Sequence, residues 1–120
     1  MRLTLDDETT LTFRKSFFAA AMNLPYEGGG FRFAPDADPS SDYFTLCIAE
    51  GISKPRILTI LPLAFSGKHV GKRGVHLITY KKAVIHTQMP LCVHTDGEIF
   101  GFYDTVTFEA RPERLRVIMK

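Results

Sequence analysis

Short apolar runs recur along the 120-residue chain, and turn-forming residues separate each run from the next. Residues 2–5 and 10–13 alternate polar and apolar side chains on either side of an acidic turn, which is typical of a β-hairpin with one buried face. Closely spaced short strands are typical of antiparallel sandwiches and barrels. The sequence therefore predicts a mainly β fold, an antiparallel β-sandwich with one amphipathic helix. Further strands are expected at 17–22 (buried on both faces), from Phe31 to Phe33, and at 43–49, 75–80, 83–87, 91–94, 102–110 and 115–119.

One segment, 53–66, has helical periodicity instead. Ser53 suits the N-cap, and Pro55 falls in the first turn, where its missing N–H costs little. Gly67 suits the position after the helix, and Pro62 is expected to kink the last turn. The apolar face would be formed by Ile57, Ile60, Leu61, Ala64 and Phe65.

Composition excludes several classes of protein. An apolar fraction of 45% is that of a folded chain, and a net charge of +2 lacks the dense basic stripe of a nucleic-acid-binding protein. Cys47 and Cys92 each lie in an apolar run, so we expect two buried thiols without a disulfide. The N-terminus has no signal-peptide pattern and no apolar run approaches the ~20 residues that span a bilayer, so the cytoplasm is the expected compartment.

Motifs in a fixed order cover nearly the whole chain, which is long enough for one domain. They are Met22-Asn23, Gly28-Gly29-Gly30 and Ala34-Pro35-Asp36-Ala37, then Tyr43-Phe44-Thr45-Leu46, Gly67-Lys68-His69 and Val93-His94-Thr95-Asp96-Gly97-Glu98. In order and spacing this set resembles the C-terminal, lipid-substrate domain of the bacterial diacylglycerol kinase and YegS-like lipid kinase family. The chain would begin and end directly on strands, as expected for a domain taken from a longer protein.

The resemblance implies a two-domain enzyme that transfers the γ-phosphate of ATP to a lipid hydroxyl such as that of diacylglycerol. An N-terminal nucleotide-binding domain with a Gly-Gly-Asp-Gly-Thr motif would bind ATP and the catalytic Mg²⁺. That motif does not occur in these 120 residues, so the chain alone is expected to be inactive. The implied partners are that domain, the lipid and a membrane surface, without nucleic acid; a homodimer is compatible with the family. The implied location is the cytoplasm, at the inner face of the membrane.

The segment Thr95-Asp96-Gly97-Glu98 joins two predicted strands. Asp-Gly is a favoured two-residue hairpin turn, and the residues alone favour a plain turn. The resemblance implies more, namely that Glu98 accepts the proton of the lipid hydroxyl and that Asp96 neighbours it in the active site. Such a carboxylate would orient or deprotonate the attacking alcohol during phosphoryl transfer. The division of roles between Asp96 and Glu98 stays open.

The resemblance also implies a structural Mg²⁺ in the loop 38–43, held by Asp38, Ser41 and Tyr43. The sequence departs from the family there, because Ser40-Ser41-Asp42 replaces the usual Asp-Asp-Gly. Asp42 is a candidate substitute ligand, although Mg²⁺ demands strict octahedral geometry. The alternative is an Asx-type loop without a metal.

Other features have both a functional and a structural interpretation. The basic residues Lys68, His69, Lys72 and Arg73 could meet anionic headgroups or belong to a solvated loop. The apolar helix face and the phenylalanines at 13, 17, 18, 31 and 33 could receive a lipid tail, or form core. His76 and His86 lie in predicted strands and have no expected ligand role, whereas His94 could line the cleft.

Two functions therefore remain in view. The first is the substrate half of a lipid kinase, with the lipid itself undetermined. The second is a stand-alone β-sandwich module that binds a carbohydrate or protein without catalysis. The absence of tryptophan disfavours a sugar-binding platform.

Overall fold

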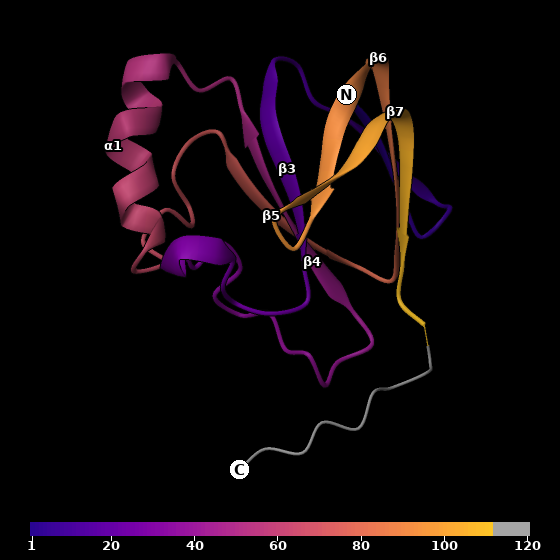
Figure 1. Ribbon diagram of the computed structural model, residues 1–120, viewed down its shortest axis with the longest axis horizontal. Helices are drawn as coiled ribbons and strands as arrows, with labels where there is room; N and C mark the ends of the chain where they lie inside the picture. The colour runs from indigo at the N-terminus through magenta and orange to yellow at the C-terminus, as the bar shows by residue number, and fades with distance from the viewer. Residues whose placement is uncertain (112–120) are drawn as a thin grey trace.

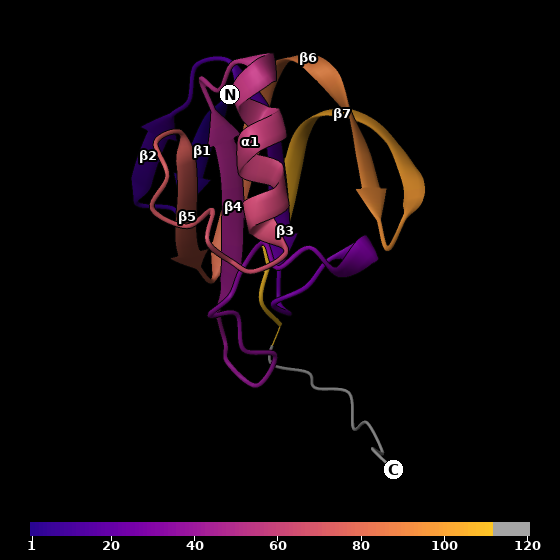
Figure 2. The ribbon, with the colours of Figure 1, turned by 90° about the vertical axis from the view of Figure 1, so that its left-hand side faces the viewer.

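A computed structural model describes residues 1–111 and contains two antiparallel sheets with a helix against one of them. Figures 1 and 2 show three layers, in which α1 covers the outer face of one sheet and the other sheet packs on its inner face. The three-stranded sheet has the order β3-β4-β5, and the four-stranded sheet has the order β2-β1-β6-β7. The predicted mainly β sandwich with one helix is confirmed.

The element bounds follow the predicted runs closely, with two exceptions described below. The strands are β1 (Arg2–Leu5), β2 (Thr9–Thr12), β3 (Ser16–Met22), β4 (Phe44–Glu50), β5 (Val75–Tyr80), β6 (Lys82–Thr95) and β7 (Glu98–Glu109). The helices are the 3₁₀ turn η1 (Gly28–Gly30) and α1 (Lys54–Ala64). No helix within residues 1–111 combines the length and apolarity needed to cross a bilayer.

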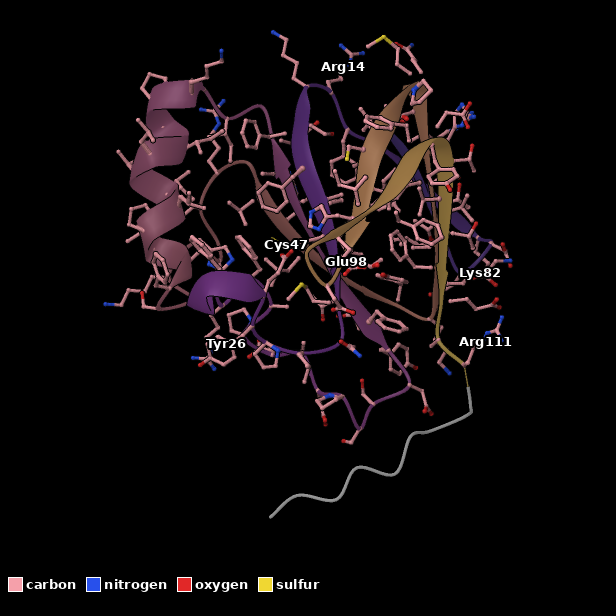
Figure 3. The ribbon with its side chains drawn as sticks, in the orientation of Figure 1. Arg14, Tyr26, Cys47, Lys82, Glu98 and Arg111 are labelled. Carbon is pink, nitrogen blue, oxygen red and sulfur yellow. The ribbon has the colours of Figure 1, made fainter. Side chains whose placement is uncertain are left out.

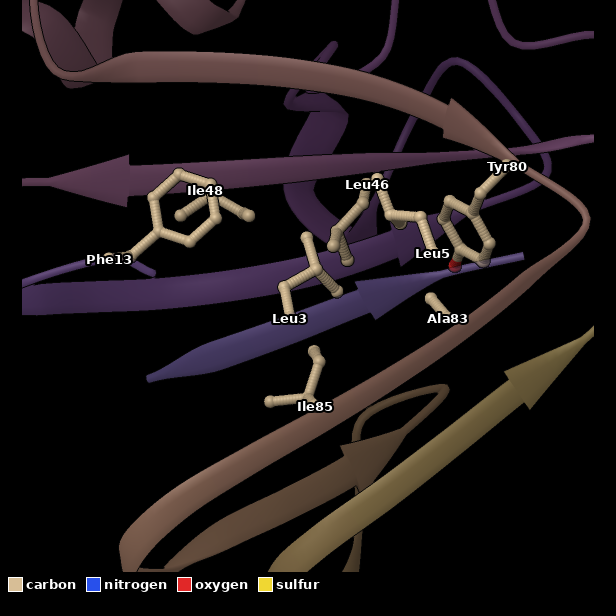
Figure 4. Packing of buried hydrophobic residues seen from close by; sticks show 8 residues of the cluster. All are labelled: Leu3, Leu5, Phe13, Leu46, Ile48, Tyr80, Ala83 and Ile85. Carbon is tan, nitrogen blue, oxygen red and sulfur yellow. The ribbon is translucent and has the colours of Figure 1, made fainter. Parts of the chain in front are cut away.

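The core lies between the two sheets, where alternate side chains of each strand meet. Leu3 and Leu5 of β1 face Leu46 and Ile48 of β4, and each of these four is buried. Figure 4 shows how the inward side chains from both sheets interlock along this seam. The full buried cluster is Leu3, Leu5, Phe13, Leu46, Ile48, Tyr80, Ala83 and Ile85.

β6 and β7 form a hairpin much longer than their partners. Only the first part of β6 pairs with β1, from Ala83 opposite Leu5 to His86 opposite Arg2. Beyond His86 the described strands give β6 no partner except β7. We call residues 88–103 the hairpin arm; Figure 2 shows it projecting away from the packed sheets. The predicted strands 83–87 and 91–94 are therefore two parts of one strand.

α1 is fastened at its C-terminal end. Gly67 has a φ of +72°, and the N–H of Lys68 donates to the carbonyl of Leu63 at 2.9 Å, as in a Schellman motif. The predicted roles of Gly67 and Pro55 are thus confirmed. Ser53 occupies the N-cap position, but its side chain makes no capping hydrogen bond. Pro62 lies in the last turn, which tightens into i→i−3 bonds such as Phe65 N–H to the Pro62 carbonyl.

One strand prediction and two burial predictions are wrong. Phe31 to Phe33 forms no strand. Its backbone is hydrogen-bonded to the end of α1 instead, because the N–H of Arg32 donates to the Ala64 carbonyl at 2.8 Å. β3 is an edge strand of its sheet, and Phe17 on it is 60% exposed, so it is not buried on both faces. Cys92 is exposed because it lies on the hairpin arm. The predicted strand 115–119 falls outside the described residues.

Candidate functional site

A cleft of about 1410 Å³ is bounded by β3, α1 and the hairpin arm. It is open on one side and lined mainly by apolar side chains. This volume exceeds that of an ordinary small-ligand pocket, which holds roughly 300–1,000 Å³. The cleft is therefore wide enough for a ligand with long apolar chains.

The floor of the cleft includes the edge strand β3, which carries three successive alanines, Ala19, Ala20 and Ala21. A methyl group fills little space, so the edge strand leaves a hollow where larger residues would close it. Cys47 of β4 pairs with Ala20 and also lines the cleft. Burial, with the Glu27 carboxylate adding to it, raises the pKa of the Cys47 thiol to about 11. That thiol is thus part of the apolar floor.

An aromatic cluster forms the wall between β3 and α1. Phe31 stacks on Phe65 at the end of α1 with ring centroids 4.3 Å apart, and on Phe33 at 5.4 Å. Phe18 of β3 meets Phe33 at 5.4 Å. Of the predicted phenylalanine stripe, only Phe13 lies in the buried core. The cluster joins the helix to the sheet and gives the cleft an aromatic side.

The tip of the hairpin arm carries the predicted catalytic carboxylates. Asp96 and Gly97 form the two-residue turn, with φ of +50° and +85°, as a type I′ hairpin requires. Thr95 is paired with Glu98, so their side chains lie on the same face of the hairpin. Thr95 and Asp96 line the cleft, whereas Glu98 does not, and both carboxylates are exposed. Figure 3 shows Glu98 at the tip of the hairpin arm.

Two residues on the arm shape its groove-facing side, and the sequence analysis did not single them out. Gly101 has a φ of +152°, and a Cβ added there would lie 2.8 Å from the Tyr103 ring. The Tyr103 ring therefore lies over Gly101, and Tyr103 is paired with Leu91 of β6. Leu91 and Tyr103 line the cleft, whereas Gly101 does not. The signal was present in the sequence as a glycine two residues before an aromatic in a strand-like run.

The predicted metal loop is held together by its own hydrogen bonds. The Asp38 carboxylate accepts the backbone N–H and the hydroxyl of Ser40 at 2.8 and 2.6 Å. The Ser41 hydroxyl donates to the Tyr43 carbonyl at 2.9 Å, and it accepts the Tyr43 N–H at 3.3 Å. These are the contacts of an Asx-type loop, and they engage the Asp38 carboxylate and the Tyr43 carbonyl, two of the oxygens expected to hold Mg²⁺. Within residues 1–111 no cluster of three or more His, Cys, Asp or Glu side chains is arranged to hold a metal. The Mg²⁺ site at Asp38, Ser41 and Tyr43 therefore stays a prediction, and no chemistry is assigned to a metal here.

The basic residues after the helix separate into two groups. Lys68, Lys72 and Arg73 are exposed, whereas His69 is 2% exposed and its Nε2 contacts the Phe33 carbonyl at 3.1 Å. His69 therefore helps to fasten the post-helix loop and is not part of a solvated basic cluster. Its ring packs edge-on against Phe33, with centroids 6.1 Å apart.

The remaining histidines have separate surroundings. His76 contacts the Glu50 carboxylate at 3.3 Å, and His86 contacts the Thr105 hydroxyl at 3.1 Å. His94 lines the cleft beside the turn, as the sequence analysis suggested. Only His94 is thus near the candidate carboxylates.

Comparison with known proteins places this architecture in a family. The family model described as the YegS C-terminal NAD kinase β-sandwich-like domain matches residues 1–119. The putative lipid kinase YtlR of Bacillus subtilis is 35% identical over 98 residues, which is 82% of this chain and 31% of that protein. A diacylglycerol kinase of Mycobacterium tuberculosis is 29% identical over 92 residues, covering 76% of this chain and 29% of that protein.

The chain spans about a third of the length of these relatives. No solved structure gives a significant match. Since the family model covers nearly all of the residues, the chain belongs to the family of YegS C-terminal NAD-kinase β-sandwich-like domains.

Proposed function

We propose that this chain is the lipid-binding half of an ATP-dependent lipid kinase, which transfers the γ-phosphate to the hydroxyl of diacylglycerol or a similar lipid. The observation that carries the proposal is an apolar cleft with a carboxylate-bearing turn at its rim. The names of the relatives, a putative lipid kinase and a diacylglycerol kinase, support the same class of reaction. The enzyme would work in the cytoplasm, where ATP is available.

In this proposal the cleft holds the acyl chains of the lipid. Transfer of apolar surface from water to an apolar wall is favourable by roughly 25 cal/mol per Å², or about 0.8 kcal/mol per methylene. The alanines of β3, the aromatic cluster and the arm residues Leu91 and Tyr103 supply that wall. A lipid anchored there would present its polar end at the rim, next to Asp96.

The turn would act on the hydroxyl. Phosphoryl transfer relies on positioning and charge neutralisation, with a carboxylate that orients the nucleophile or accepts its proton. Glu98 is proposed as the proton acceptor and Asp96 as its neighbour, with Asp96 in the two-residue turn and Glu98 directly after it at the start of β7. ATP would be bound by the part of the protein that this chain does not include, and Mg²⁺ bound with it would neutralise phosphate charge.

The test is Glu98→Gln in the complete protein. Loss of a general base costs about 10²–10⁴-fold, so kcat should fall by that factor while the KM for lipid changes little. Glu109→Gln is the matched control, because Glu109 is an exposed glutamate at the opposite end of β7. Asp96→Asn tests the neighbour, since asparagine also tolerates the positive φ of the turn. Near-normal turnover in Glu98→Gln would reject the assignment of the proton acceptor.

A further inference from the structure

A second hollow lies at the end of the sandwich where β1 begins and β2 ends. Its volume is about 620 Å³, within the range of ordinary small-ligand sites, which hold roughly 300–1,000 Å³. Its polar lining among the described residues consists of Arg2, Thr12, Arg14, Lys15, His86 and Gln88. Three of these side chains carry a permanent positive charge, and none is acidic. We call this space the basic hollow.

Strand pairing places part of this lining in one row across the four-stranded sheet. Arg2 of β1 is paired with Thr12 of β2 on one side and with His86 of β6 on the other. Directly paired residues of antiparallel strands have their side chains on the same face of the sheet. Leu3 is buried in the core, so its neighbour Arg2 and the whole row lie on the outer face.

The other two cations stand on the turn between β2 and β3, and its backbone is fixed. The N–H of Arg14 donates to the Glu50 carboxylate, and the Lys15 carbonyl accepts the N–H of Gly51 at 3.2 Å. Both bonds join the turn to the end of β4. Because the backbone is already held, a ligand would have to order only the side chains of Arg14 and Lys15, which lowers the cost of binding.

The cations of the basic hollow have no counter-charge among the described residues. Within residues 1–111, Arg2, Arg14 and Lys15 take part in no ion pair. The Glu50 carboxylate is bonded to the Arg14 backbone and lies 3.3 Å from the ring of His76, and it does not line the hollow. Like charges around one space repel each other, and an anion among them would turn this repulsion into attraction.

We propose that the basic hollow binds the phosphate group of a small phosphorylated molecule. Each guanidinium group presents a planar fork of N–H donors that can bind two phosphate oxygens at once. Lys15 would add a point charge, and the Thr12 hydroxyl and the Gln88 amide can donate to oxygens that remain. The volume leaves room beside the phosphate for the organic part of an ester.

The basic hollow is distinct from the proposed reaction site. Gln88 lines both the hollow and the cleft, but Asp96 follows it eight positions later along the hairpin arm. At about 3.3 Å per residue this separation is roughly 26 Å along the strand. Figure 3 also shows Arg14 at one end of the sandwich, away from Glu98. A phosphate group bound here would be an additional ligand and not the group transferred.

The experiment is calorimetric titration of the chain with glycerol 3-phosphate, with inorganic phosphate, and with dihexanoyl phosphatidic acid below its micelle concentration. We expect saturable binding at one site per chain. Arg2→Gln and Arg14→Gln should each weaken it about tenfold, because each removes a charge-assisted hydrogen-bonding group. Arg2→Lys should also weaken it, since lysine keeps the charge but loses the fork. Arg56→Gln, which removes an exposed arginine of α1, is the matched control and should bind like the unmodified chain.

The outcomes separate a phosphate site from a general attraction for anions. Binding of the two soluble phosphates, weakened in both glutamine variants, supports the site with a soluble ester as its ligand. Binding of dihexanoyl phosphatidic acid alone, weakened in the same way, supports the site with a lipid phosphate as its ligand. Unchanged binding in Arg2→Gln, or an equal loss in Arg56→Gln, would overturn the proposal.

Two further readouts complete the test. The substituted arginines are exposed, so the variants should keep the fold, which circular dichroism would verify. Absence of saturable binding by a correctly folded chain, with any of the three probes, would overturn the proposal. The titration involves no ATP and no turnover, so its failure would leave the proposed kinase function intact, and a protein without kinase activity could still bind phosphate here.

Discussion

Gly74 is the position where a single methyl group should disturb the fold most. Its φ is +89°, and an added Cβ would lie 2.5 Å from the backbone oxygen of Glu50 and 2.7 Å from Cγ1 of Ile52. The same two segments are joined by a hydrogen bond of 2.7 Å from the Glu50 N–H to the Gly74 carbonyl. Because the contact is with backbone, no side-chain rotation relieves it. Gly74→Ala must therefore shift β4 or the start of β5.

The magnitude follows from a comparison with Gly71. That glycine has a φ of +76° and no atom within 4 Å of its added Cβ. Gly71→Ala should therefore lower the free energy of unfolding by only about 1 kcal/mol, the cost of a left-handed backbone for an L-residue. Gly74→Ala adds overpacking of about 1–3 kcal/mol and weakens a hydrogen bond that contributes about 1 kcal/mol. We expect a loss of about 3 kcal/mol or more for Gly74→Ala.

Urea unfolding followed by circular dichroism would measure both variants. The midpoint should drop clearly further for Gly74→Ala than for Gly71→Ala, with similar slopes. Equal losses would refute the reasoning, since they would show that the close approach of Gly74 to Glu50 does not constrain the fold.

Three further predictions concern the core and the cleft. Tyr80→Phe should raise the unfolding free energy by about 1 kcal/mol, because the buried Tyr80 hydroxyl has no hydrogen-bond partner among the described residues; a lower urea midpoint would contradict this. Iodoacetamide at pH 8 should label exposed Cys92 well before Cys47, since burial raises the pKa of the Cys47 thiol to about 11; equal labelling in peptide mass spectrometry would argue against the buried floor. Ala20→Phe should fill part of the cleft and raise the KM for lipid in the complete protein while the KM for ATP stays the same; an unchanged lipid KM would place the acyl chains elsewhere.

The parts of the fold that local patterns determine could be predicted from the sequence. Alternation of apolar residues located β1 and β2, and Asp96-Gly97 located the tip of the long hairpin. Gly67 located the end of α1, because only a residue that tolerates positive φ suits that position. These features depend on neighbours in the chain, so one sequence is enough to reveal them.

The errors arose where tertiary contacts decide the outcome. The Phe31 to Phe33 segment has strand-like alternation, but the Arg32 N–H bonds to the end of α1, which no local pattern announces. His69 looks like part of a basic loop, yet its ring packs on Phe33 and is buried. The apolar run of β3 reads as a core strand, although β3 is the edge of its sheet and faces the cleft.

The candidate site, like the fold, could be predicted from the sequence only in part. The carboxylates of Asp96 and Glu98 were singled out through family resemblance, and their roles remain predictions. The cleft itself was not predicted as a hollow, since it arises from the alanines of β3 meeting an arm that extends beyond its partner strands. The structural Mg²⁺ also remains a prediction; in the loop 38–43 the Asp38 carboxylate and the Tyr43 carbonyl accept hydrogen bonds from within the loop.

The central claim is tested most directly by γ-labelled ATP and the complete protein that contains this chain. The protein would be incubated with diacylglycerol and other lipid alcohols in mixed micelles, and the extracted lipids would be separated. The account predicts a labelled lipid phosphate monoester from at least one lipid alcohol. A folded complete protein that binds ATP but labels no lipid would contradict the account, and it would favour a domain that binds a ligand without phosphorylating it.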